Sequence, residues 1–525
     1  PRIQMRRGRI LIPPHTTFSS NYRRHGRGAR PVMQCHDPLS FALICASCFF
    51  VWGDQNLMAP NLSQIAACFK FDDAERDAKL GGQLSVAFFL LGLPATLIIG
   101  LLCDVVQRKQ VLVATLLLGQ GPCLLTIFVT QFWQLFVLRA LTGIAVGGAL
   151  PLVYSITGDL FPKSSRTHAS ALVGIVSSLG SMTGQGIAGF MGPSYGWRLP
   201  FVVVAAPGLC VAFLVWRFAE EPKRGGAEGS RAVMDYVRPG EKDSAFEHIA
   251  SKTSSSKSSS SKEVSETERN APPPSITFGS LLKDFAKKSK SVFARKTNVL
   301  VFLQGIPGCV PWSIIGVFMN DYLAVDKGLG VTAATAVLMC FGAGALFGTI
   351  GGGFVGQSLY NRQPFYATAF MGAAAVGGIF PWLFLVDYDG YDVGNAGSMR
   401  RVYLTATFAG CLCSVTGVNV RAVTVNVNKH HERGTAFAFF NLTDDLGKGF
   451  GPVLCAFLIR KMGRQRAFDF GFWCWVPCGV LCVLCGFTVP HDEARVRREA
   501  RTLGENSGDG TSETAALLGG GDKMV

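Results

Sequence analysis

Long apolar runs alternate with short charged segments along this chain. Twelve windows of about 20 residues carry few charges, which is the length needed to cross the hydrocarbon core of a bilayer. Backbone polar groups in such windows need partners within the segment, so each is predicted to be an α-helix, and the alternation of a membrane β-barrel is absent. The windows are 39–60, 80–103, 110–130, 133–158, 169–192, 199–219, 297–319, 331–355, 365–386, 402–427, 434–458 and 467–489.

The windows fall into two sets of six, which predicts an all-α membrane protein built from two six-helix bundles. A Ser/Lys-rich stretch, "SKTSSSKSSSSKEVSE", followed by "APPP" predicts a disordered linker between them. Near its end, "ITFGSLLKDFAKKSK" predicts a basic amphipathic helix on the membrane surface. The expected regions are a basic tail (1–38), an N-terminal bundle (39–219), the linker (220–296), a C-terminal bundle (297–489) and a second tail (490–525).

Composition and charge agree with a membrane protein. Hydrophobic residues make up 49% and charged residues 16%, against about 25% charged in soluble proteins. The formal net charge of +15 is concentrated in the N-terminal tail and the linker, so it indicates topology and not a nucleic-acid partner. An even number of spans places both tails and the linker on one side, expected to be the cytoplasm.

The cysteines and the catalytic motifs exclude other classes. Most of the sixteen cysteines lie within the windows, and neither CxxC pair, Cys45/Cys48 or Cys482/Cys485, has a second pair or a histidine at zinc spacing. We interpret them as packing residues, with no metal site. No Gly-x-Ser-x-Gly, HExxH or phosphate-binding glycine loop occurs in a suitable context, so we expect neither an enzyme nor a cofactor.

The two halves resemble each other in sequence. "RTHASALVGIVSSLGSMTG" (166–184) aligns with "RGTAFAFFNLTDDLGKGFG" (433–451) at an offset of 267. Such a repeat predicts two bundles related by an axis along the membrane normal, with a substrate site between them near the midplane. Small residues on these helices are expected to allow close helix packing: Gly143, Gly147, Gly180, Gly184, Gly447 and Gly451.

Two motifs, together with the spans and the repeat, resemble the major facilitator superfamily of transporters. The loop after the second window reads "GLLCDVVQRK", which matches the family pattern through Gly100, Asp104, Arg108 and Lys109. The fourth window reads "RALTGIAVGG", which matches through Arg139, Gly143 and Gly147. The resemblance implies that the first motif forms a cytoplasmic gate, and Asp159 with Arg166 is expected to join it. The alternative is that Arg108 and Lys109 only set topology.

A narrower resemblance is to the Spinster-like branch, whose members are implicated in exporting sphingoid or lysophospholipid species. It is carried by "WGDQNLMAPNL", "RALTG" and "RGTAFAFFNLTDDLGKGFGP". This chain departs from the branch at two places. Gln55 follows Asp54 where the branch usually has Arg, and Ala145-Val146-Gly147 replaces its usual Gly-Glu-Ala. A proton-coupling scheme that uses that glutamate is therefore not implied here.

Ionisable residues inside spans are the main site candidates, because an unpaired charge in the bilayer is costly. We expect Asp54 to take up and release a proton during transport, or alternatively to lie solvated at the exterior mouth. Arg139 is the natural counter-charge in the same half, as a substrate anchor or as part of a structural ion pair. Arg421, in the tenth window, is a further candidate.

The eleventh window contains a polar turn, formed by Asn441, Asp444, Asp445 and Lys448. Their spacings of three and four residues allow all four to share one helical stripe, with one ion pair and a net charge of one negative. We expect this stripe to face a cavity opposite Asp54 and Arg139, where it binds a head group or exchanges ion pairs. The alternative is an internal salt-bridge stripe that serves packing.

The sequence therefore predicts a secondary active transporter that works by alternating access. The expected cargo is a small amphipathic or anionic solute, with a lysolipid or sphingoid-type lipid favoured, and coupling to protons is a hypothesis. The alternatives are an organic-anion or sugar-phosphate symporter and a non-transporting receptor or scaffold. The expected partners are this solute, protons and membrane lipids, with the chain acting as a monomer. The plasma membrane or an endolysosomal or vacuolar membrane is expected; an organelle envelope stays open because the Arg-rich start resembles a transit peptide.

Overall fold

The computed structural model describes residues 37–102, 106–161, 163–222, 278–429 and 432–506. These residues form helices and connecting turns, and the described part contains no β-strand. Eleven of its helical segments are long and apolar enough to cross a membrane. A twelfth, α17 (Arg433–Met462), has 30 residues but carries more charges than that criterion allows. The helices coincide with the twelve predicted windows, so the predicted fold class is confirmed.

The N-terminal half contains six crossings, the first of which is longer than predicted because a short helix continues it. Its elements are α1 (Pro38–Gln55), η1 (Ala59–Asn61), α2 (Leu62–Phe69), α3 (Asp73–Glu75), η2 (Arg76–Gln83), α4 (Leu84–Leu102), α5 (Arg108–Leu125), η3 (Thr126–Phe128), α6 (Phe132–Leu160), α7 (Lys163–Tyr195) and α8 (Leu199–Phe218).

The C-terminal half contains the other six crossings, preceded by the helix that was predicted at the end of the linker. Its elements are α11 (Phe278–Phe293), α12 (Lys296–Ile314), η4 (Ile315–Met319), η5 (Tyr322–Asp326), α13 (Gly330–Arg362), α14 (Pro364–Gly377), α15 (Ile379–Asp387), α16 (Ala396–Asn426), α17, α18 (Arg464–Phe472) and α19 (Trp475–Asn506). The last helix continues to Asn506, well beyond the predicted end at 489.

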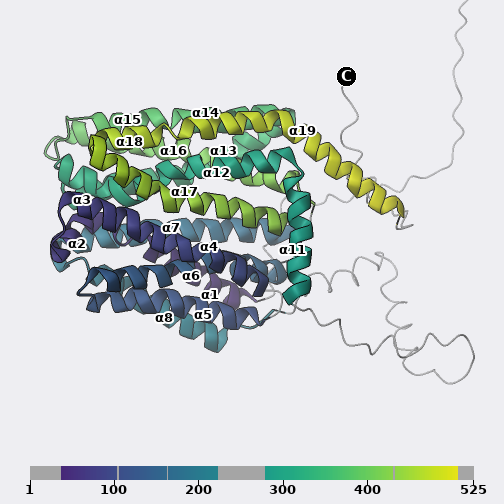
Figure 1. Cartoon of the computed structure of the whole chain (residues 1–525), viewed down its shortest axis with the longest axis horizontal. Helices are drawn as coiled ribbons and strands as arrows, with labels where there is room; N and C mark the ends of the chain where they lie inside the picture. Colours follow the sequence, from purple (N-terminus) through teal and green to yellow (C-terminus); the bar gives the residue numbers. More distant parts are fainter. Residues whose placement is uncertain (1–36, 103–105, 162, 223–277, 430–431, 507–525) are drawn as a thin grey trace, which may run out of the picture.

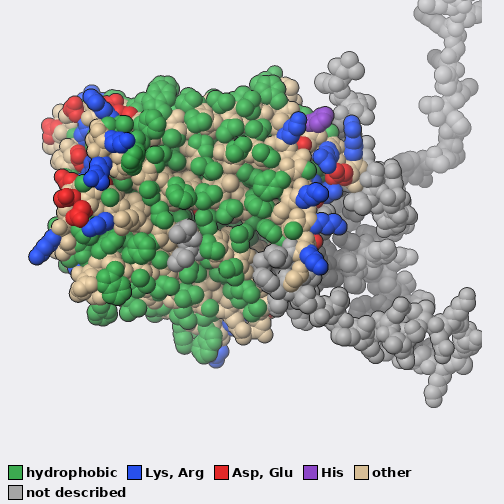
Figure 2. All heavy atoms as spheres, viewed as in Figure 1, with side chains coloured by type: hydrophobic (Ala, Val, Ile, Leu, Met, Phe, Trp, Pro, Cys, Tyr) green, Lys and Arg blue, Asp and Glu red, His purple; other side chains and the backbone are tan. Residues whose placement is uncertain are grey.

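The spans run roughly parallel, with the C-terminal half above the N-terminal half in Figure 1. The halves contact each other through α4 with α17 and α7 with α13, and also through η2 with α17 and with η4. We call the end that carries α11 the linker side, and the end that carries α2 and α3 the opposite side. The face drawn in Figure 2 is hydrophobic between two charged ends, as expected for a belt that contacts lipid.

Glycines from the predicted repeat lie at equivalent contacts in the two halves. A Cβ on Gly143 of α6 would lie 1.8 Å from the Phe88 carbonyl oxygen of α4, and one on Gly410 of α16 would lie 2.0 Å from the Phe341 carbonyl oxygen of α13. The pair Gly180 and Gly447 behaves in the same way, with α7 against α1 and α17 against α12. Only glycine allows these backbones to approach so closely, so the close contacts of one half recur in the other.

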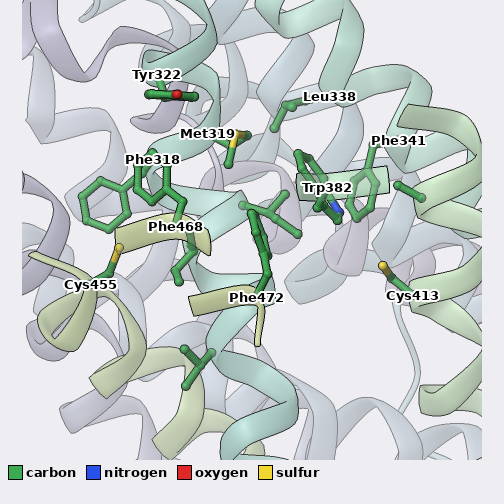
Figure 3. Packing of buried hydrophobic residues seen from close by; sticks show 14 of the residues in the cluster. Phe318, Met319, Tyr322, Leu338, Phe341, Trp382, Cys413, Cys455, Phe468 and Phe472 are labelled. Carbon is green, nitrogen blue, oxygen red and sulfur yellow. The ribbon is translucent and has the colours of Figure 1, made fainter. Parts of the chain in front are cut away.

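A cluster of aromatic side chains holds the C-terminal half together near the opposite side (Figure 3). Phe318 packs against Phe468 with ring centroids 6.0 Å apart, and Trp382 stacks on Phe472 at 5.5 Å. All four side chains are fully buried. Aromatic pairs of this kind contribute both buried area and preferred geometry, so they provide a rigid base for the neighbouring turns.

The amphipathic helix α11 uses its apolar face differently from the prediction. It crosses the linker-side end of the bundle, at a steep angle to the spans (Figure 1). Phe285 stacks on Phe439 of α17 at 5.8 Å, and Phe293 contacts both Phe439 and Phe302. The aromatic residues therefore attach the helix to the C-terminal half, while Lys283, Lys287 and Lys290 are exposed. The N-terminal tail and the Ser-rich part of the linker lie outside the described residues.

Candidate functional site

A buried ion pair lies inside the N-terminal half. Asp54, in the last turn of α1, accepts a hydrogen bond from Arg139 of α6, with 3.0 Å between Oδ1 and Nη2. The guanidinium also lies over the ring of Phe201 from α8, 5.0 Å from its centroid. The exposed fraction is 0% for Asp54 and 3% for Arg139. The structure thus brings together the two residues that the sequence suggested as charge partners.

The enclosure of this pair limits what it can contact. Asp54 is not solvated at an exterior mouth, because the surrounding helices cover it completely. Its Oδ2 atom and the Arg139 Nε atom have no hydrogen-bond partner among the described residues. No described hydrogen bond or ion pair links Asp54 or Arg139 to the polar turn of α17, so the two groups do not meet in this state.

The side chains of the polar turn of α17 do not all face the same neighbouring helix. Lys448 pairs with Asp445 at 3.0 Å, and both side chains are partly exposed, at 35% and 22%. Asp445 lines a narrow gap against α4 together with Leu93, Thr96, Leu97, Ala438 and Leu442. Asp444 points instead toward α12, where a Cβ on Gly305 would lie 2.6 Å from its Oδ1 atom. Consecutive residues are about 100° apart on a helix, so the predicted single stripe becomes two.

Asn441 and the glycines on the same helix lie close to this turn. Asn441 is half-buried, one turn nearer the linker side. Gly447 faces α12, where an added Cβ would lie 2.5 Å from the Ile306 carbonyl oxygen, and Gly451 faces Ser313 of the same helix. The charged turn is therefore placed by a close α12–α17 contact, which leaves Asp445 toward α4 of the other half.

The gate residues predicted on the linker side form contacts within the N-terminal half. Arg108, at the start of α5, pairs with Asp159 of α6 and with Glu221, the latter at 3.2 Å. The Lys109 backbone N–H also donates to Glu221, at 2.7 Å. Glu221 was not among the predicted residues. Asp104 lies outside the described residues, as do the side chain of Arg166 and the surroundings of Gly100.

A second linker-side cluster belongs to the C-terminal half. Arg295 pairs with Glu432 at 2.6 Å and donates to the Asn428 side chain at 2.9 Å. Burial by itself raises the pKa of the Glu432 carboxyl, but hydrogen bonds from Ser291 and Arg295 outweigh it, and the pKa lies below its usual value. The ionised pair therefore stabilises the fold at neutral pH, and this contribution is lost as the pH falls through the lowered pKa.

Among the described residues, the ion pairs that join the two halves lie on the opposite side, and the sequence analysis did not predict them. We call Arg76, Asp77, Asp321, Asp326 and Arg464 the inter-half network. Arg464 of α18 donates to Asp77 of η2, with 3.0 Å between Nε and Oδ2. It also pairs with Asp321 at 2.9 Å and with Asp326 at 2.7 Å. Arg76 approaches Asp321 at 3.7 Å, and the Ser63 backbone N–H donates to Asp321 at 2.9 Å.

Most of this network is buried although it consists of charged groups, and Asp326 is its exposed member. Asp77 and Asp321 are each 2% exposed, and Arg464 is 8% exposed. Hydrogen-bonded charges can remain ionised in such a place only while their partners stay together. The one sequence signal was the density of charges in "DDAERDAK" (72–79) and near Arg464, two segments that lie outside the predicted windows.

An apolar contact beside the network also joins the halves. Gly81 in η2 lies against the ring of Phe318 in η4, and an added Cβ would be 2.2 Å from the Phe318 Cε1 atom. Both segments are π-helical turns, as is η5. Such turns are rare and occur often at functional sites. On the opposite side the halves are therefore held together both by ion pairs and by the packing of the Phe318 ring against Gly81.

We expect Gly81→Ala to prevent full closure of the opposite side. Phe318 is fully buried and packed against Phe468, so it cannot move away from the added methyl group. Overpacking costs about 1–3 kcal/mol, which corresponds to a roughly 5- to 150-fold shift between two states. To measure this shift, a cysteine is placed at Phe89 and an impermeant thiol reagent is added from the opposite side.

The neighbouring glycine provides the control for this experiment. An added Cβ on Gly82 would meet nothing closer than the Val453 Cα atom at 3.5 Å, an ordinary contact. Gly82→Ala should therefore label like the parent protein, in a background without other reactive cysteines. Equal labelling of the Gly81→Ala and Gly82→Ala variants would show that the Phe318 contact does not hold the halves together.

The described residues contain no group of three or more metal-ligating side chains, and none of their cysteines forms a disulfide. Two equivalent six-helix halves, internal charge pairs and a charged contact between the halves are the features of a solute transporter of the membrane. The chain matches the model of the Major Facilitator Superfamily over residues 44–399. It therefore belongs to the Major Facilitator Superfamily, a family of multi-pass membrane transporters and not of enzymes.

Individual relatives are distant. The chain is 28% identical to synaptic vesicle glycoprotein 2B of Homo sapiens over 192 residues, which covers 34% of this chain and 28% of the relative. It is 28% identical to sphingosine-1-phosphate transporter SPNS2 of Danio rerio over 202 residues, 38% of this chain and 39% of that protein. These alignments span well under half of either relative's length.

The fold is shared over a greater length. A bacterial homolog of the human lysosomal transporter Spinster, solved in an inward-facing and unoccupied conformation, superimposes with a TM-score of 0.65. The match covers 87% of this chain and 98% of that protein at 17% sequence identity. Identity at this level supports the common fold, in agreement with the Spinster-like resemblance noted in the sequence.

Proposed function

We propose that this protein is a secondary active transporter that moves a small amphipathic or anionic solute by alternating access. The observation that carries the proposal is the buried inter-half network on the opposite side. Its ion pairs exist while that side is closed and are lost when the halves part there. Interactions present in only one of two states bias the equilibrium between them, which is the physical requirement for alternating access.

A lysolipid or a sphingoid-type lipid is the cargo we favour. The similarity to a transporter named for sphingosine-1-phosphate supports this choice. So does the arrangement on α17, where the charged pair Asp445–Lys448 lies beside the apolar residues Leu93, Leu97 and Leu442. A head group and a tail need those two environments next to each other. An organic anion or a sugar phosphate would use only the charged part.

The orientation of the protein in the membrane is proposed from the distribution of basic residues. We propose that the linker side faces the cytoplasm, because exposed lysines of α11 lie at that end and the linker sequence is rich in lysine. The membrane is proposed to be the plasma membrane or an endolysosomal or vacuolar membrane, with the chain acting as a monomer. Gly100, Asp104, Arg108, Lys109, Asp159 and Arg166 are proposed to gate the linker side.

Proton coupling is proposed to involve Asp54. A proton on this carboxylate would cancel its charge and weaken its hold on Arg139, which cannot itself lose a proton. Because the pair is enclosed by helices, protonation requires the N-terminal half to open around it. The coupling would therefore act through the shape of this half and not through direct contact between Asp54 and the cargo.

Reconstituted liposomes test the proposal directly. The purified protein should carry a labelled lysolipid or sphingoid phosphate across the bilayer faster than protein-free liposomes do. A panel that adds a hexose phosphate and an organic anion distinguishes the alternative cargo classes. Binding of a probe without movement of any member of the panel would instead indicate a receptor or scaffold, and would contradict the proposal.

A further inference from the structure

The described residues contain three π-helical turns, and all three lie where the halves meet on the opposite side. η2 carries Arg76, Asp77 and Gly81, η4 carries Phe318, and η5 ends at Asp326. Each of these five residues belongs to the inter-half network or to the Gly81–Phe318 contact. Because π-helical turns are rare, their common location links this type of helix to the contact between the halves.

The backbone of η2 differs from an α-helix by one residue. The Leu84 N–H donates to the carbonyl oxygen of Lys79, five residues earlier, whereas an α-helix bonds residues four apart. The turn therefore holds one residue more than a turn of α4, the α-helix that follows it. At the other end of η2, α3 has only three residues, Asp73–Glu75. A change in the winding of η2 can therefore be taken up at α3 without moving α4.

Contacts from the C-terminal half support η2 in this shape. The helix that packs most extensively against η2 is α17. Asp77 accepts a hydrogen bond from Arg464 of α18, with 3.0 Å between Oδ2 and Nε, and Gly81 lies against the Phe318 ring. A sparsely populated backbone shape persists only where the surrounding contacts hold it. These contacts exist while the opposite side is closed, so the π-helical turn loses this support when the halves part there.

We propose that η2 changes from a π-helical turn to an α-helix when the opposite side opens, and that this change completes the release of the inter-half network. The inference rests on the proposed function, because it describes one step of alternating access. Removing the extra residue from the turn rotates the residues before it by about 100° around the helix axis. Arg76 and Asp77 then point away from Asp321 and Arg464, their partners in the C-terminal half.

This change in winding makes the opening of the opposite side a switch between two states. While η2 is π-helical, Asp77 is placed to pair with Arg464. Once η2 is α-helical, the pair cannot form again until the extra residue returns to the turn. Interactions that exist in only one of two states bias the equilibrium between them. The π-helical turn and the contact between the halves therefore stabilise each other, and a half-open arrangement is disfavoured.

A pair of metal-binding histidines distinguishes the two types of helix. Ala78 and Gln83 are exposed and five residues apart, a spacing that shares one face of a π-helical turn but lies about 140° apart on an α-helix. Ni²⁺ bound by Ala78→His/Gln83→His should therefore hold the π-helical turn. A ligand that binds only one state shifts the equilibrium by a factor of 1 + [L]/Kd. At Ni²⁺ tenfold above its Kd, labelling of a cysteine at position 89 from the opposite side should slow about tenfold.

A pair with a spacing of four residues is the matched control. Lys79→His/Gln83→His shares one substitution with the first pair, and residues four apart share a face in both types of helix. Ni²⁺ should therefore leave its labelling unchanged. The protein that carries only the cysteine at position 89 controls for Ni²⁺ binding to the thiol, and calorimetry measures Ni²⁺ binding to each variant. Equal slowing in both pairs would overturn the proposal, as would a five-residue pair that binds no Ni²⁺ or binds it without slowing.

Amide hydrogen exchange distinguishes a change of helix type from unwinding. Arg464→Gln removes a partner of Asp77 and is expected to open the opposite side without added histidines. If η2 becomes an α-helix, its amides stay hydrogen-bonded, and exchange over residues 76–84 should stay within about twofold of the parent protein. Exchange as fast as in an unfolded peptide would show that η2 unwinds, which contradicts the proposal. Neither measurement uses a cargo, so a failure of the liposome assay refutes transport and leaves the helix change standing.

Discussion

Replacing Arg464 with glutamine is expected to open the opposite side of the protein. The substitution removes the shared cation of three carboxylates, Asp77, Asp321 and Asp326. Two of these are 2% exposed, and breaking a buried ion pair typically costs about 3–5 kcal/mol. Because the carboxylates come from both halves, parting the halves exposes them to water and relieves the cost. The population should therefore move toward the state that is open on the opposite side, and the chain should not simply unfold.

Thiol labelling at position 89 from the opposite side measures this shift, with thermal unfolding recorded in parallel. Arg466→Gln is the matched control, because Arg466 lies on the same helix but is exposed. Adding Asp77→Asn and Asp321→Asn to Arg464→Gln removes most of the stranded charge and should restore much of the closed state. The inter-half network has no role in closure if Arg464→Gln and Arg466→Gln label alike.

Asp54→Asn is the second substitution with a large expected effect. It leaves Arg139 as a cation that is 3% exposed and has lost its only described carboxylate partner. We expect a loss of about 3–5 kcal/mol in the free energy of unfolding, measured as a lower thermal midpoint in detergent. The double variant Asp54→Asn/Arg139→Gln removes both charges, and its midpoint should lie well above that of Asp54→Asn.

The same variants test the coupling proposal. Uptake by the wild-type protein should depend on external pH, and this dependence should disappear in the double variant, which keeps a folded N-terminal half without a titratable group there. If uptake by both proteins changes equally with pH, Asp54 takes no part in proton coupling. A double variant as unstable as Asp54→Asn would show that shape, and not the charge of the pair, is what the site requires.

Several parts of the candidate site could be read from the sequence because they are local or repeated. Asp445 and Lys448 are three residues apart on one helix, and helical spacing alone predicts that they can pair. Asp54 and Arg139 were paired by elimination, since the bilayer leaves few partners for a charge in either segment. Gly143 and Gly410 are separated by the repeat offset of 267 and lie at equivalent contacts.

Other parts depend on contacts between distant segments. Arg464 and Asp77 are separated by 387 positions, and each is adjacent to loops where charges are ordinary. Asp444 and Asp445 are neighbours in sequence, yet one faces α12 and the other α4. Glu221 pairs with Arg108 on the linker side, although the sequence analysis placed Glu221 at the start of the linker.

The sequence by itself determined the twelve helices, their division into two related halves and the few charges that the membrane must accommodate. Hydrophobic length and the cost of bare polar groups in lipid leave no other solution for such segments. Only the tertiary structure decided which charges form ion pairs with one another and at which end described ion pairs join the halves. Ion pairs are defined by distances of a few ångströms between side chains, and packing of whole helices sets those distances.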